Sequence, residues 1–323
     1  MTKHYIGWYN VENLFDVEDS GHRSEFLKRR LARELEGWDR KVLSRKVAQL
    51  ASVIGRMNGS AGPDILGVCE VENEPVLELL ARAVGDHVSG RDYKVVHAAS
   101  ADPRGIDVAF LYDARAFEAG ESFTHRVVKR RATRDILQVN FYSRKSDQVL
   151  VVVGNHWPSR SGGEQASEPY RIVAGETLAY WMTRIPEALG DPDVPVVVMG
   201  DFNDDPFDRA LRDYALSTRS VRKVLMARTA PRLLNLMWPL MGDEATFYFN
   251  NFPFMLDQFM VSKGLLDERS AFSVRPDSVE VICDDDMVEG SYRVPRRFGR
   301  PSRSMDHDGF SDHFPIGLVL HER

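Results

Sequence analysis

The sequence predicts an α/β fold in one domain that covers residues 1–323. Short β-rich runs alternate with amphipathic or loop stretches along the whole chain, which is the pattern of sheets flanked by helices. No linker rich in Gly, Ser or Pro, no repeat and no low-complexity tract divides the chain. The composition of 43% hydrophobic and 28% charged residues is that of a globular protein, so disordered, collagenous and coiled-coil classes are excluded.

The predicted strands are short runs of apolar, β-branched and aromatic residues, and their number requires at least one large sheet. In chain order we expect strands at residues 4–9, 65–69, 93–97, 107–112, 137–142, 149–156, 194–200, 258–261 and 316–320. The longest apolar runs have strand length and fall far short of the ~20 residues of a membrane-spanning helix. We therefore expect no membrane span.

Three amphipathic helices are predicted from apolar residues that recur at helical spacing. The first stripe consists of Leu43, Val47, Leu50, Ile54 and Met57. The second consists of Val76, Leu79, Leu80 and Ala83. The third helix is expected to begin at residue 164 or 167 and to end near residue 184, with apolar contributions from Ile172, Leu178 and Trp181.

Several predicted strands end in a side chain that can bind a metal ion or a phosphate. These residues are Asn10, Glu70, His156 and Asp201, with Asn203 just beyond. Ligands collect at strand ends in sheet-based enzymes, because the loops there present side chains on a rigid scaffold. Taken singly, an Asp or Asn after a strand is more often a turn residue or a helix cap.

Two local motifs are the strongest signals. After a buried strand, Gly200 allows a tight exit, and the two-residue spacing of Asp201 and Asn203 can bring both side chains to one side of an extended turn. Near the end of the chain, Asp312 and His313 precede an apolar strand. Adjacent residues of an extended chain point apart, so these two serve different partners and do not form a serine-hydrolase triad with Ser311. P-loop, dinucleotide-binding, H-E-x-x-H and G-x-S-x-G motifs are absent.

With these motifs in this order, the chain resembles the endonuclease/exonuclease/phosphatase (deoxyribonuclease I-like) superfamily, and within it a bacterial branch. The matching segments are 8–13 (WYNVEN), 64–70 (DILGVCE), 104–109 (RGIDVA), 154–158 (GNHWP), 200–203 (GDFN), 255–262 (MLDQFMVS) and 311–313 (SDH). The resemblance implies a four-layer α/β sandwich, in which two mixed β-sheets pack face to face between outer helices. The alternation of strands and helices is compatible with this fold but does not distinguish it from other α/β architectures.

The resemblance also implies metal-assisted hydrolysis of a phosphate ester. It makes Asn10, Glu70 and Asp312 the ligands of a Mg²⁺ or Mn²⁺ ion, a hard cation that prefers oxygen ligands. Glu72 or Glu74 competes with Glu70 for this role, although the position directly after the strand favours Glu70. A further acid, Glu12, is either an additional metal contact or a solvated loop residue.

The remaining catalytic roles come from the same resemblance. Asp201 would position or deprotonate the attacking water, while Asn203 and His156 would hold non-bridging phosphate oxygens. His313, oriented by Asp257, would stabilise developing negative charge. Taken alone, His156 could equally be a histidine of the core.

Three arginines, Arg104, Arg160 and Arg171, could clamp a phosphate through two hydrogen bonds. For each of them a structural salt bridge is at least an equal alternative. His307 and Asp308, just ahead of the last motif, are expected to be loop residues.

Two basic clusters stand out against a net charge of −6. They are Arg126, Lys129, Arg130, Arg131 and Arg134, and then Arg293, Arg296, Arg297, Arg300 and Arg303. If these clusters lie beside the site, they would bind successive phosphates along a polynucleotide. As solvated loops they would be neutralised in part by Glu280, Asp284, Asp285, Asp286 and Glu289. Aromatic residues could stack on bases or pack within a loop, namely Phe247, Tyr248, Phe249, Phe252 and Phe254.

The leading prediction is therefore a Mg²⁺- or Mn²⁺-dependent phosphodiesterase that acts on nucleic acid. The alternative is a phosphomonoesterase or a phospholipid phosphodiesterase on the same fold, because the shared motifs report the reaction centre and not the substrate. A binding protein with a dead site is disfavoured because every expected site residue is present. No obligate protein partner is evident.

Two cysteines, Cys69 and Cys283, make neither a disulfide framework nor a CxxC metal site, and Cys69 is expected to be buried. The start of the chain has no charged segment followed by an apolar one, so we expect a cytoplasmic protein. Removal of an export signal would leave the same start.

Overall fold

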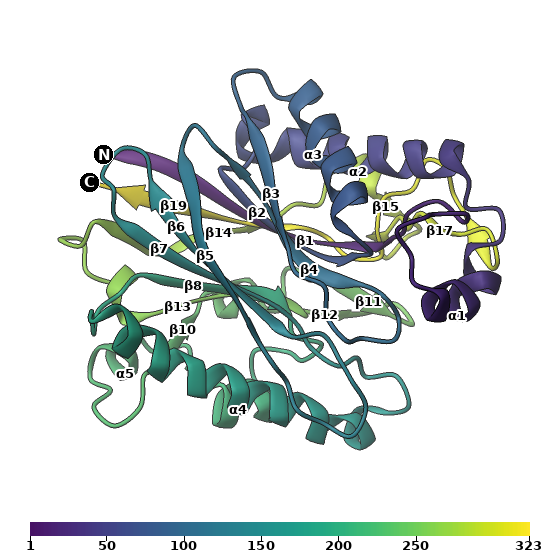
Figure 1. Ribbon diagram of the computed structural model, residues 1–323. Coiled ribbons are helices and arrows are strands. Elements are labelled where there is room, and N and C mark those ends of the chain that lie inside the picture. The colour runs from purple at the N-terminus through teal and green to yellow at the C-terminus, as the bar shows by residue number, and fades with distance from the viewer.

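Two mixed β-sheets packed face to face form the centre of the molecule in a computed structural model that describes all 323 residues (Figure 1). One sheet has six strands: β1 (Thr2–Leu14), β2 (Ile65–Val71), β3 (Tyr93–His97), β4 (Asp107–Asp113), β14 (Phe272–Val281) and β19 (Ile316–Glu322). Their order is β14-β19-β1-β2-β4-β3, and only β1 and β2 run parallel.

The second sheet has seven strands: β5 (Phe117–His125), β6 (Ile136–Ser143), β7 (Val149–His156), β8 (Val196–Asp201), β9 (Ser217–Thr218), β10 (Leu233–Asn235) and β13 (Asp257–Val261). Their order is β5-β6-β7-β8-β13-β10-β9, with parallel pairs β7–β8 and β10–β9. Short hairpins complete the strands: β11 (Phe247–Phe249) with β12 (Phe252–Phe254), β15 (Val288–Glu289) with β16 (Val294–Pro295), and β17 (Gly299–Arg300) with β18 (Ser304–Met305).

Helices cover the outer face of each sheet, so the layers follow the order helix, sheet, sheet, helix (Figure 1). The longer helices are α2 (Arg40–Ser60) and α3 (Glu74–His87) on the six-stranded sheet and α4 (Glu164–Leu189) on the seven-stranded sheet. The remaining helical segments are α1 (Glu25–Leu35), α5 (Val221–Leu225) and single turns at Ala210–Tyr214, Trp238–Leu240, Lys263–Leu265 and Asp285–Met287. The predicted four-layer α/β sandwich is confirmed.

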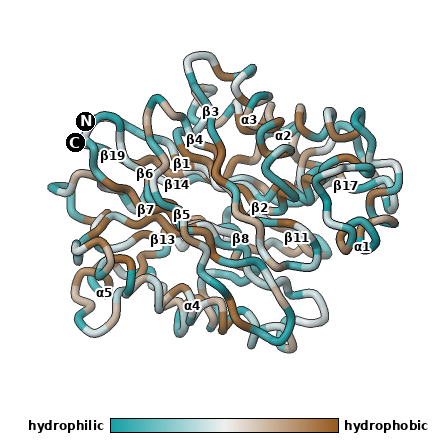
Figure 2. Tube along the Cα trace, viewed as in Figure 1, coloured by the Kyte–Doolittle hydropathy of each residue, from teal (hydrophilic) through white to brown (hydrophobic).

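The core follows from the two-residue period of side chains along a strand. In β1, Ile6 and Trp8 pack between the sheets, whereas Tyr5 and Tyr9 face the layer of α2 and α3. Since both faces of the central strands are covered, these strands are nearly continuous apolar runs, and Figure 2 shows hydrophobic colour along them. Cys69 is fully buried, as expected, and both cysteines are free.

All predicted strands and helices are present, but two strands continue past their expected ends. β1 runs through Asn10 to Leu14, and β2 runs through Glu70 to Val71. Both contain irregularities at these points, where Glu12, Asn13 and Glu70 have φ angles of 48°, 54° and 68°. The expectation that β1 ends at Tyr9 is therefore wrong. A bulge, rather than a turn, redirects the polar side chains.

The sequence analysis missed β5, β14 and α1. β5 and β14 are edge strands: β5 is mostly exposed, and in β14 exposed residues around Pro276 interrupt the buried ones, so neither has a continuous apolar run. In α1 only Leu31 and Leu35 are buried, which is too few for a visible helical stripe. No helix of the structure combines the length and apolar character that crossing a membrane requires.

A buried ionic network ties the sheets together at the end where the termini pair. The His4 ring bonds through Nε2 to Glu322 Oε2 at 2.8 Å, and its Nδ1 lies 3.5 Å from Asp64 Oδ1. Glu322 also accepts hydrogen bonds from Ser143 of the other sheet at 2.6 Å and from Ser146 at 2.5 Å. Burial lowers the pKa of His4, but its hydrogen bonds and attraction to Asp64 and Glu322 outweigh this effect and raise the pKa above its ordinary value of 6.5.

Because the pKa of His4 is raised in the folded state, its contribution to stability is complete below pH 6.5 and is lost as the pH rises through the raised pKa. We expect His4→Gln to lower the free energy of unfolding by about 3 kcal/mol at pH 6, since it leaves the buried Glu322 carboxylate without its cation, whereas Asp64 keeps Arg91. Urea denaturation between pH 6 and pH 9 measures this. The difference between wild type and variant should shrink as the pH rises; a constant difference would show that charge on His4 contributes nothing.

Candidate active site

The residues predicted to carry the chemistry meet at the end of the sheets opposite the paired termini. In the seven-stranded sheet, His156 and Asp257 both stand opposite Asp201 in the strand register, one from β7 and the other from β13. In the six-stranded sheet, Asn10 reaches across and donates from Nδ2 to Asp201 Oδ2 at 3.1 Å. The packing of two sheets thus brings together residues that are far apart in the chain.

His313 and Asp257 form a buried charged pair, with Nδ1 of the ring donating to Oδ2 at 2.6 Å. Burial alone would lower the pKa of His313, but its attraction to and hydrogen bond with Asp257, with help from Asp201, raise the pKa to about 10. The imidazole is therefore protonated at neutral pH. Its free Nε2 lies 4.0 Å from Asp201 Oδ2, so the proton faces the centre of the site.

Asp201 is the last residue of β8, and the turn after it holds its carboxylate. The backbone N–H of Asn203 donates to Asp201 Oδ1 at 2.9 Å, and Asn203 has a φ of 53°, the left-handed conformation that Asn tolerates well. Burial raises the pKa of Asp201, His313 lowers it, and Asp257 raises it further, so that the net shift is upward. The side-chain amide of Asn203 donates to the Trp157 carbonyl at 3.1 Å, which fixes its orientation.

His156 lies between the carboxylates of the two sheets. Its Nε2 is 3.7 Å from Glu70 Oε1 and 3.6 Å from Asp201 Oδ2, and its buried Nδ1 has no hydrogen-bond partner. Burial, with the positive charges of Arg104 and His313, lowers the pKa of His156 well below its ordinary value. The ring is therefore neutral, and its Nδ1 is one of the few polar atoms of the site that can still form a hydrogen bond.

Glu70 and Asp312 bring negative charge to one place, with Asn10 beside them. Burial raises the pKa of Asp312, and repulsion by Glu12 and Glu70 raises it further, against the opposing effect of His313. The amide oxygen of Asn10 accepts from the Glu12 backbone at 3.0 Å, and Glu70 Oε2 accepts from the Asn13 backbone at 2.9 Å. A divalent cation would relieve this repulsion, and the oxygen donors fit Mg²⁺ or Mn²⁺.

Compact groups of potential metal ligands are found elsewhere in the site. The ligand atoms of Cys69, His156 and Asp201 lie within 4.8 Å of one another, and so do those of Asp201, Asp257 and His313. The thiol of Cys69 was not among the predicted site residues, because its apolar surroundings in the sequence indicated only burial. In the second group, His313 is already paired with Asp257, so that group acts as an ion pair.

The other acids weighed as metal ligands have structural partners. Glu12 is 1% exposed, so the expectation of a solvated loop residue is wrong; its oxygens accept from Arg297 Nε at 2.9 Å and from the backbones of Phe298 and Gly299. Glu72 is buried against Arg23 at 2.5 Å. Glu74 is exposed in the first turn of α3, where an acid favours the helix.

The three predicted phosphate-binding arginines differ in their surroundings. Arg171 is buried, and its Nε donates to Asp204 Oδ1 at 2.6 Å, which favours the salt-bridge alternative. Arg160 also has a structural role, because it donates to the Asn203 carbonyl at 2.8 Å and to Asp208 at 2.8 Å. Arg104 differs in part: its Nε lies 3.5 Å from Asp102 Oδ1, but its Nη2 is buried without a partner, and its charge acts on His156.

In the second basic cluster, from Arg293 to Arg303, most arginines form ion pairs. Most of their partners are not the acids between Glu280 and Glu289 that the sequence suggested. Arg293 pairs with Asp285, Arg296 with Asp306, and Arg300 with Glu34. Arg297 alone reaches the site, where its Nη2 lies 3.4 Å from Asp312 Oδ2. His307 and Asp308 lie in a turn and bind Arg45, as expected of loop residues.

The first basic cluster leaves most of its charge free. Arg134 is buried, pairs with Asp102 at 2.8 Å and donates to the carbonyls of His156 and Trp157, which ties this loop to the site. The other four cations have no carboxylate within 4.0 Å: Arg126, Lys129, Arg130 and Arg131. The Lys129 ammonium instead lies 4.9 Å from the centre of the Tyr170 ring.

The aromatic residues after residue 246 form the β11–β12 hairpin beside the catalytic candidates. The Phe247 ring lies 4.7 Å from the His313 ring, and Phe247 forms a bridge with His313 in the backbone. At the hairpin tip Phe249 and Phe252 are exposed, at 61% and 69%. The turn residues Asn250 and Asn251 both have positive φ, as a tight two-residue hairpin requires.

Two positioning residues were missed by the sequence analysis. The indole of Trp8 donates to Asp257 Oδ1 at 2.9 Å, and the hydroxyl of Thr246 accepts from the Asp257 backbone at 3.0 Å. Together they fix the carboxylate that orients His313. Trp8 stands within the 8–13 motif, which was the available signal, but nothing in the sequence connects it with Asp257.

The sheets, the buried His–Asp pair and the cluster of carboxylates define a hydrolase of phosphate esters. A protein-family model with the description "Endonuclease/Exonuclease/phosphatase family" matches residues 5–322 of the sequence. The chain therefore belongs to the endonuclease/exonuclease/phosphatase family, and the resemblance drawn from its motifs is confirmed. Among curated protein sequences, none matches the chain.

Several solved structures share the fold at low sequence identity. An endonuclease/exonuclease/phosphatase from Bacteroides vulgatus is 14% identical with a TM-score of 0.58, and each chain is covered in full. The human Nocturnin catalytic domain with bound sulfate is 15% identical with a TM-score of 0.57, covering 99% of this chain and 94% of that one. A mannosyl-6-phosphatase from Bacteroides thetaiotaomicron is 15% identical with a TM-score of 0.52, covering 98% and 99%.

A substitution of Arg171 tests whether this residue has a structural role or binds the substrate. Burial raises the pKa of Asp204 to about 7 even with Arg171 beside it, so removal of the guanidinium would leave a costly buried acid. We expect Arg171→Met to lower the free energy of unfolding by about 3 kcal/mol, as measured by urea denaturation. An unchanged stability with a raised KM would instead assign Arg171 to substrate binding. Arg184→Met, on the exposed part of the same helix, is the control.

The charge of Asp257 is expected to set the protonation of His313. Asp257→Asn should leave His313 largely neutral at pH 7 and slow hydrolysis of bis(p-nitrophenyl) phosphate by about 10²-fold. NMR titration of the ring would show protonation up to about pH 10 in the wild type and a much lower pKa in the variant. The control variant is Asp277→Asn, which makes the same chemical change at an exposed acid. Equal titration curves for wild type and Asp257→Asn would contradict this role.

Proposed function

We propose that this protein is a divalent-metal-dependent nuclease that hydrolyses phosphodiester bonds in DNA or RNA. The observation that carries the proposal is the free positive charge beside the site, where Lys129, Arg130 and Arg131 have no acidic partner and Arg134 anchors their loop to His156. Backbone phosphates of a polynucleotide are the ligand that such a row suits. A small phosphate monoester would need fewer cations.

The metal ion in this proposal is Mg²⁺ or Mn²⁺, held by Glu70, Asp312 and the amide oxygen of Asn10. When bound, it supplies neutralisation of phosphate charge and stabilisation of the leaving oxygen. Arg297 balances part of the same negative charge from the side of Asp312. Glu12 holds Arg297 in place, so its effect on the metal site is indirect.

The charge of each remaining side chain determines the role that we assign to it. Asp201, at the centre, orients the attacking water and accepts its proton, for which an upward shift of its pKa is suitable. The neutral His156 and the amide of Asn203 bind non-bridging phosphate oxygens. The protonated His313 places a positive charge opposite Asp201, where negative charge develops on the phosphate.

The hairpin beside His313 provides a surface for bases. Phe249 and Phe252 are exposed at its tip, while Phe247 connects the hairpin to the catalytic centre through its contact with His313. Exposed aromatic rings together with free cations favour single-stranded or locally opened nucleic acid, because unpaired bases stack on the rings.

A phosphomonoesterase or a phospholipid phosphodiesterase is the second candidate. The same fold in the mannosyl-6-phosphatase shows that this architecture also serves a phosphatase. The exposed Phe249 and Phe252 would suit contact with a lipid surface as well as with bases. The substrate therefore has to be tested directly.

Cleavage of a labelled plasmid and a labelled single strand tests the proposal. We expect cleavage with Mg²⁺ or Mn²⁺, none with EDTA, and losses of at least about 10²-fold in Asp201→Asn and His313→Ala. The control Asp191→Asn makes the same chemical change on an exposed loop and should keep full activity.

The substrate class is decided by parallel assays. Release of phosphate from inositol or sugar monoesters, or cleavage of phospholipid, without cleavage of either polymer would overturn the nuclease assignment. If the protein is a nuclease, the double variant Arg130→Ala with Arg131→Ala should bind the polymer more weakly, and its binding affinity should depend less on the salt concentration. Hydrolysis of bis(p-nitrophenyl) phosphate should be unchanged.

A further inference from the structure

A second cationic site lies at the far edge of the seven-stranded sheet. It is a cavity of about 650 Å³ beside β9 and β10, referred to below as the edge cavity. Its polar lining includes Arg212, Arg219, Lys223, Arg232, Ser217 and Trp238. The proposed catalytic side chains come instead from β1, β2, β7, β8 and β13, from the turn after β8 and from the segment before β19, and none of them lines this cavity.

The positive charge of the edge cavity is largely uncompensated. Arg219, Lys223 and Arg232 have no carboxylate within 4.0 Å, and the guanidinium of Arg219 lies 5.4 Å from the centre of the Trp238 ring. The single acid of the lining is Asp213, which pairs with Arg212 at 3.6 Å. Four cations against one acid give the cavity a net positive charge, which favours an anionic ligand.

Two buried polar groups in the lining lack any partner. Ser217 is only 3% exposed, and its hydroxyl makes no hydrogen bond; the indole N–H of Trp238 is also buried without an acceptor. Buried donors are nearly always satisfied in native proteins, so two such groups in one lining indicate a missing acceptor. An anion with several oxygens would accept from both and from the surrounding guanidinium groups.

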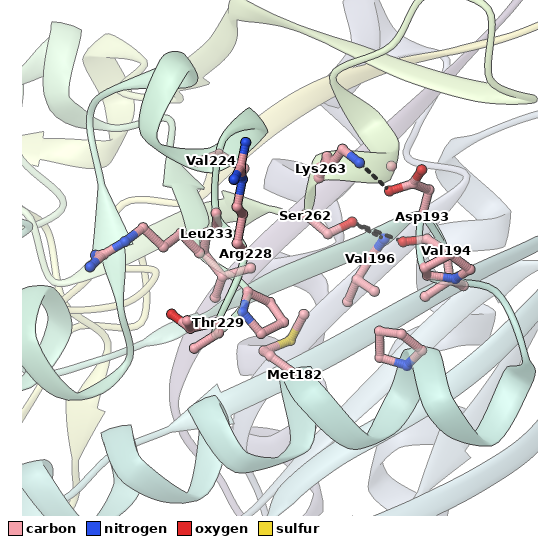
Figure 3. Close-up of a pocket in the computed structure, with 17 residues that line it drawn as sticks. Met182, Asp193, Val194, Val196, Val224, Arg228, Thr229, Leu233, Ser262 and Lys263 are labelled. Carbon is pink, nitrogen blue, oxygen red and sulfur yellow. Dashed lines mark hydrogen bonds and ion pairs between the residues drawn. The ribbon is translucent and has the colours of Figure 1, made fainter.

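The neighbouring cavity shows what a satisfied lining looks like. It shares Arg232 with the edge cavity and has a volume of about 300 Å³ (Figure 3). Its Lys263 pairs with Asp193 at 2.9 Å, and the Ser262 hydroxyl donates to the Val194 carbonyl at 2.9 Å and accepts from the Val196 backbone at 3.0 Å (Figure 3). The buried, unpartnered donors of Ser217 and Trp238 thus distinguish the edge cavity from its neighbour.

We infer that the edge cavity binds a phosphate group. Phosphate oxygens match the guanidinium, hydroxyl and indole donors, and the volume is larger than one inorganic phosphate needs. The phosphate belongs either to a free polyphosphate or nucleotide, or to the backbone of a nucleic-acid strand. This site goes beyond the proposed function, since the catalytic centre does not depend on it.

The test measures binding in EDTA with two probes, pyrophosphate by calorimetry and a fluorescein-labelled single-stranded oligonucleotide by anisotropy. The cavity variant combines Arg219→Ala with Arg232→Ala, and we expect it to bind at least one probe about tenfold more weakly than the wild type. The matched control, Arg222→Ala with Arg228→Ala, removes the same charge from the same part of the chain but outside this lining. It should bind like the wild type.

A third variant, Ser217→Ala, distinguishes binding from folding. It removes a hydroxyl that has no partner, so the free protein should keep or gain stability in urea denaturation while the same probe binds more weakly. Hydrolysis of bis(p-nitrophenyl) phosphate should be unchanged in all these variants, which shows that the catalytic centre is intact.

The pattern of losses identifies the source of the phosphate. Weaker binding of pyrophosphate in the cavity variant supports a site for a small phosphorylated compound. Weaker binding of the oligonucleotide alone supports a site for the strand backbone. The inference is overturned if neither probe binds the wild type, or if the cavity variant and its matched control bind both probes equally.

Discussion

The packing of Asp201 between the ends of two sheets is the constraint on which the rest of the site depends. Its carboxylate is 2% exposed, and water is replaced there by the Asn203 backbone, the Asn10 amide and the nearby charge of His313. Burial without these partners would be costly, because an isolated carboxylate loses its hydration. The sheets must therefore meet in one register for the acid to be tolerated at all.

A set of ion pairs away from the reaction centre holds that register. At the opposite end Glu322, paired with His4, accepts a hydrogen bond from Ser143 of the other sheet, while Arg171 fixes the acidic turn after β8 through Asp204. In each of these pairs a buried charge is compensated by a partner of opposite sign. His156 and Arg104 lie beside the catalytic acids, and each has a buried nitrogen without a hydrogen-bond partner.

In the function proposed for this protein, the centre typical of the family carries out the reaction, and the surfaces around it select the substrate. The free cations after β5 and the exposed rings of the β11–β12 hairpin lie on loops and a hairpin outside the two large sheets, where the chain can vary without disturbing the core. The edge cavity is built on the sheet itself, next to its last strand. A scaffold of this kind can therefore combine a fixed hydrolytic centre with separate contacts to a phosphorylated ligand.

The sequence by itself determined the α/β class, most strands, the three longer helices and the identity of the family, because apolar periodicity and short motifs are local properties. Apart from His313 and Asp257, which the family resemblance paired, it could not determine which polar residues face one another. Glu12 was taken for a metal contact or a solvated acid and is buried against the loop at Arg297, and Arg171, a candidate phosphate clamp, is buried against Asp204. Trp8 orients Asp257 across 249 positions of sequence. Only tertiary structure decides such pairings, because they depend on how the two sheets pack and not on any local pattern.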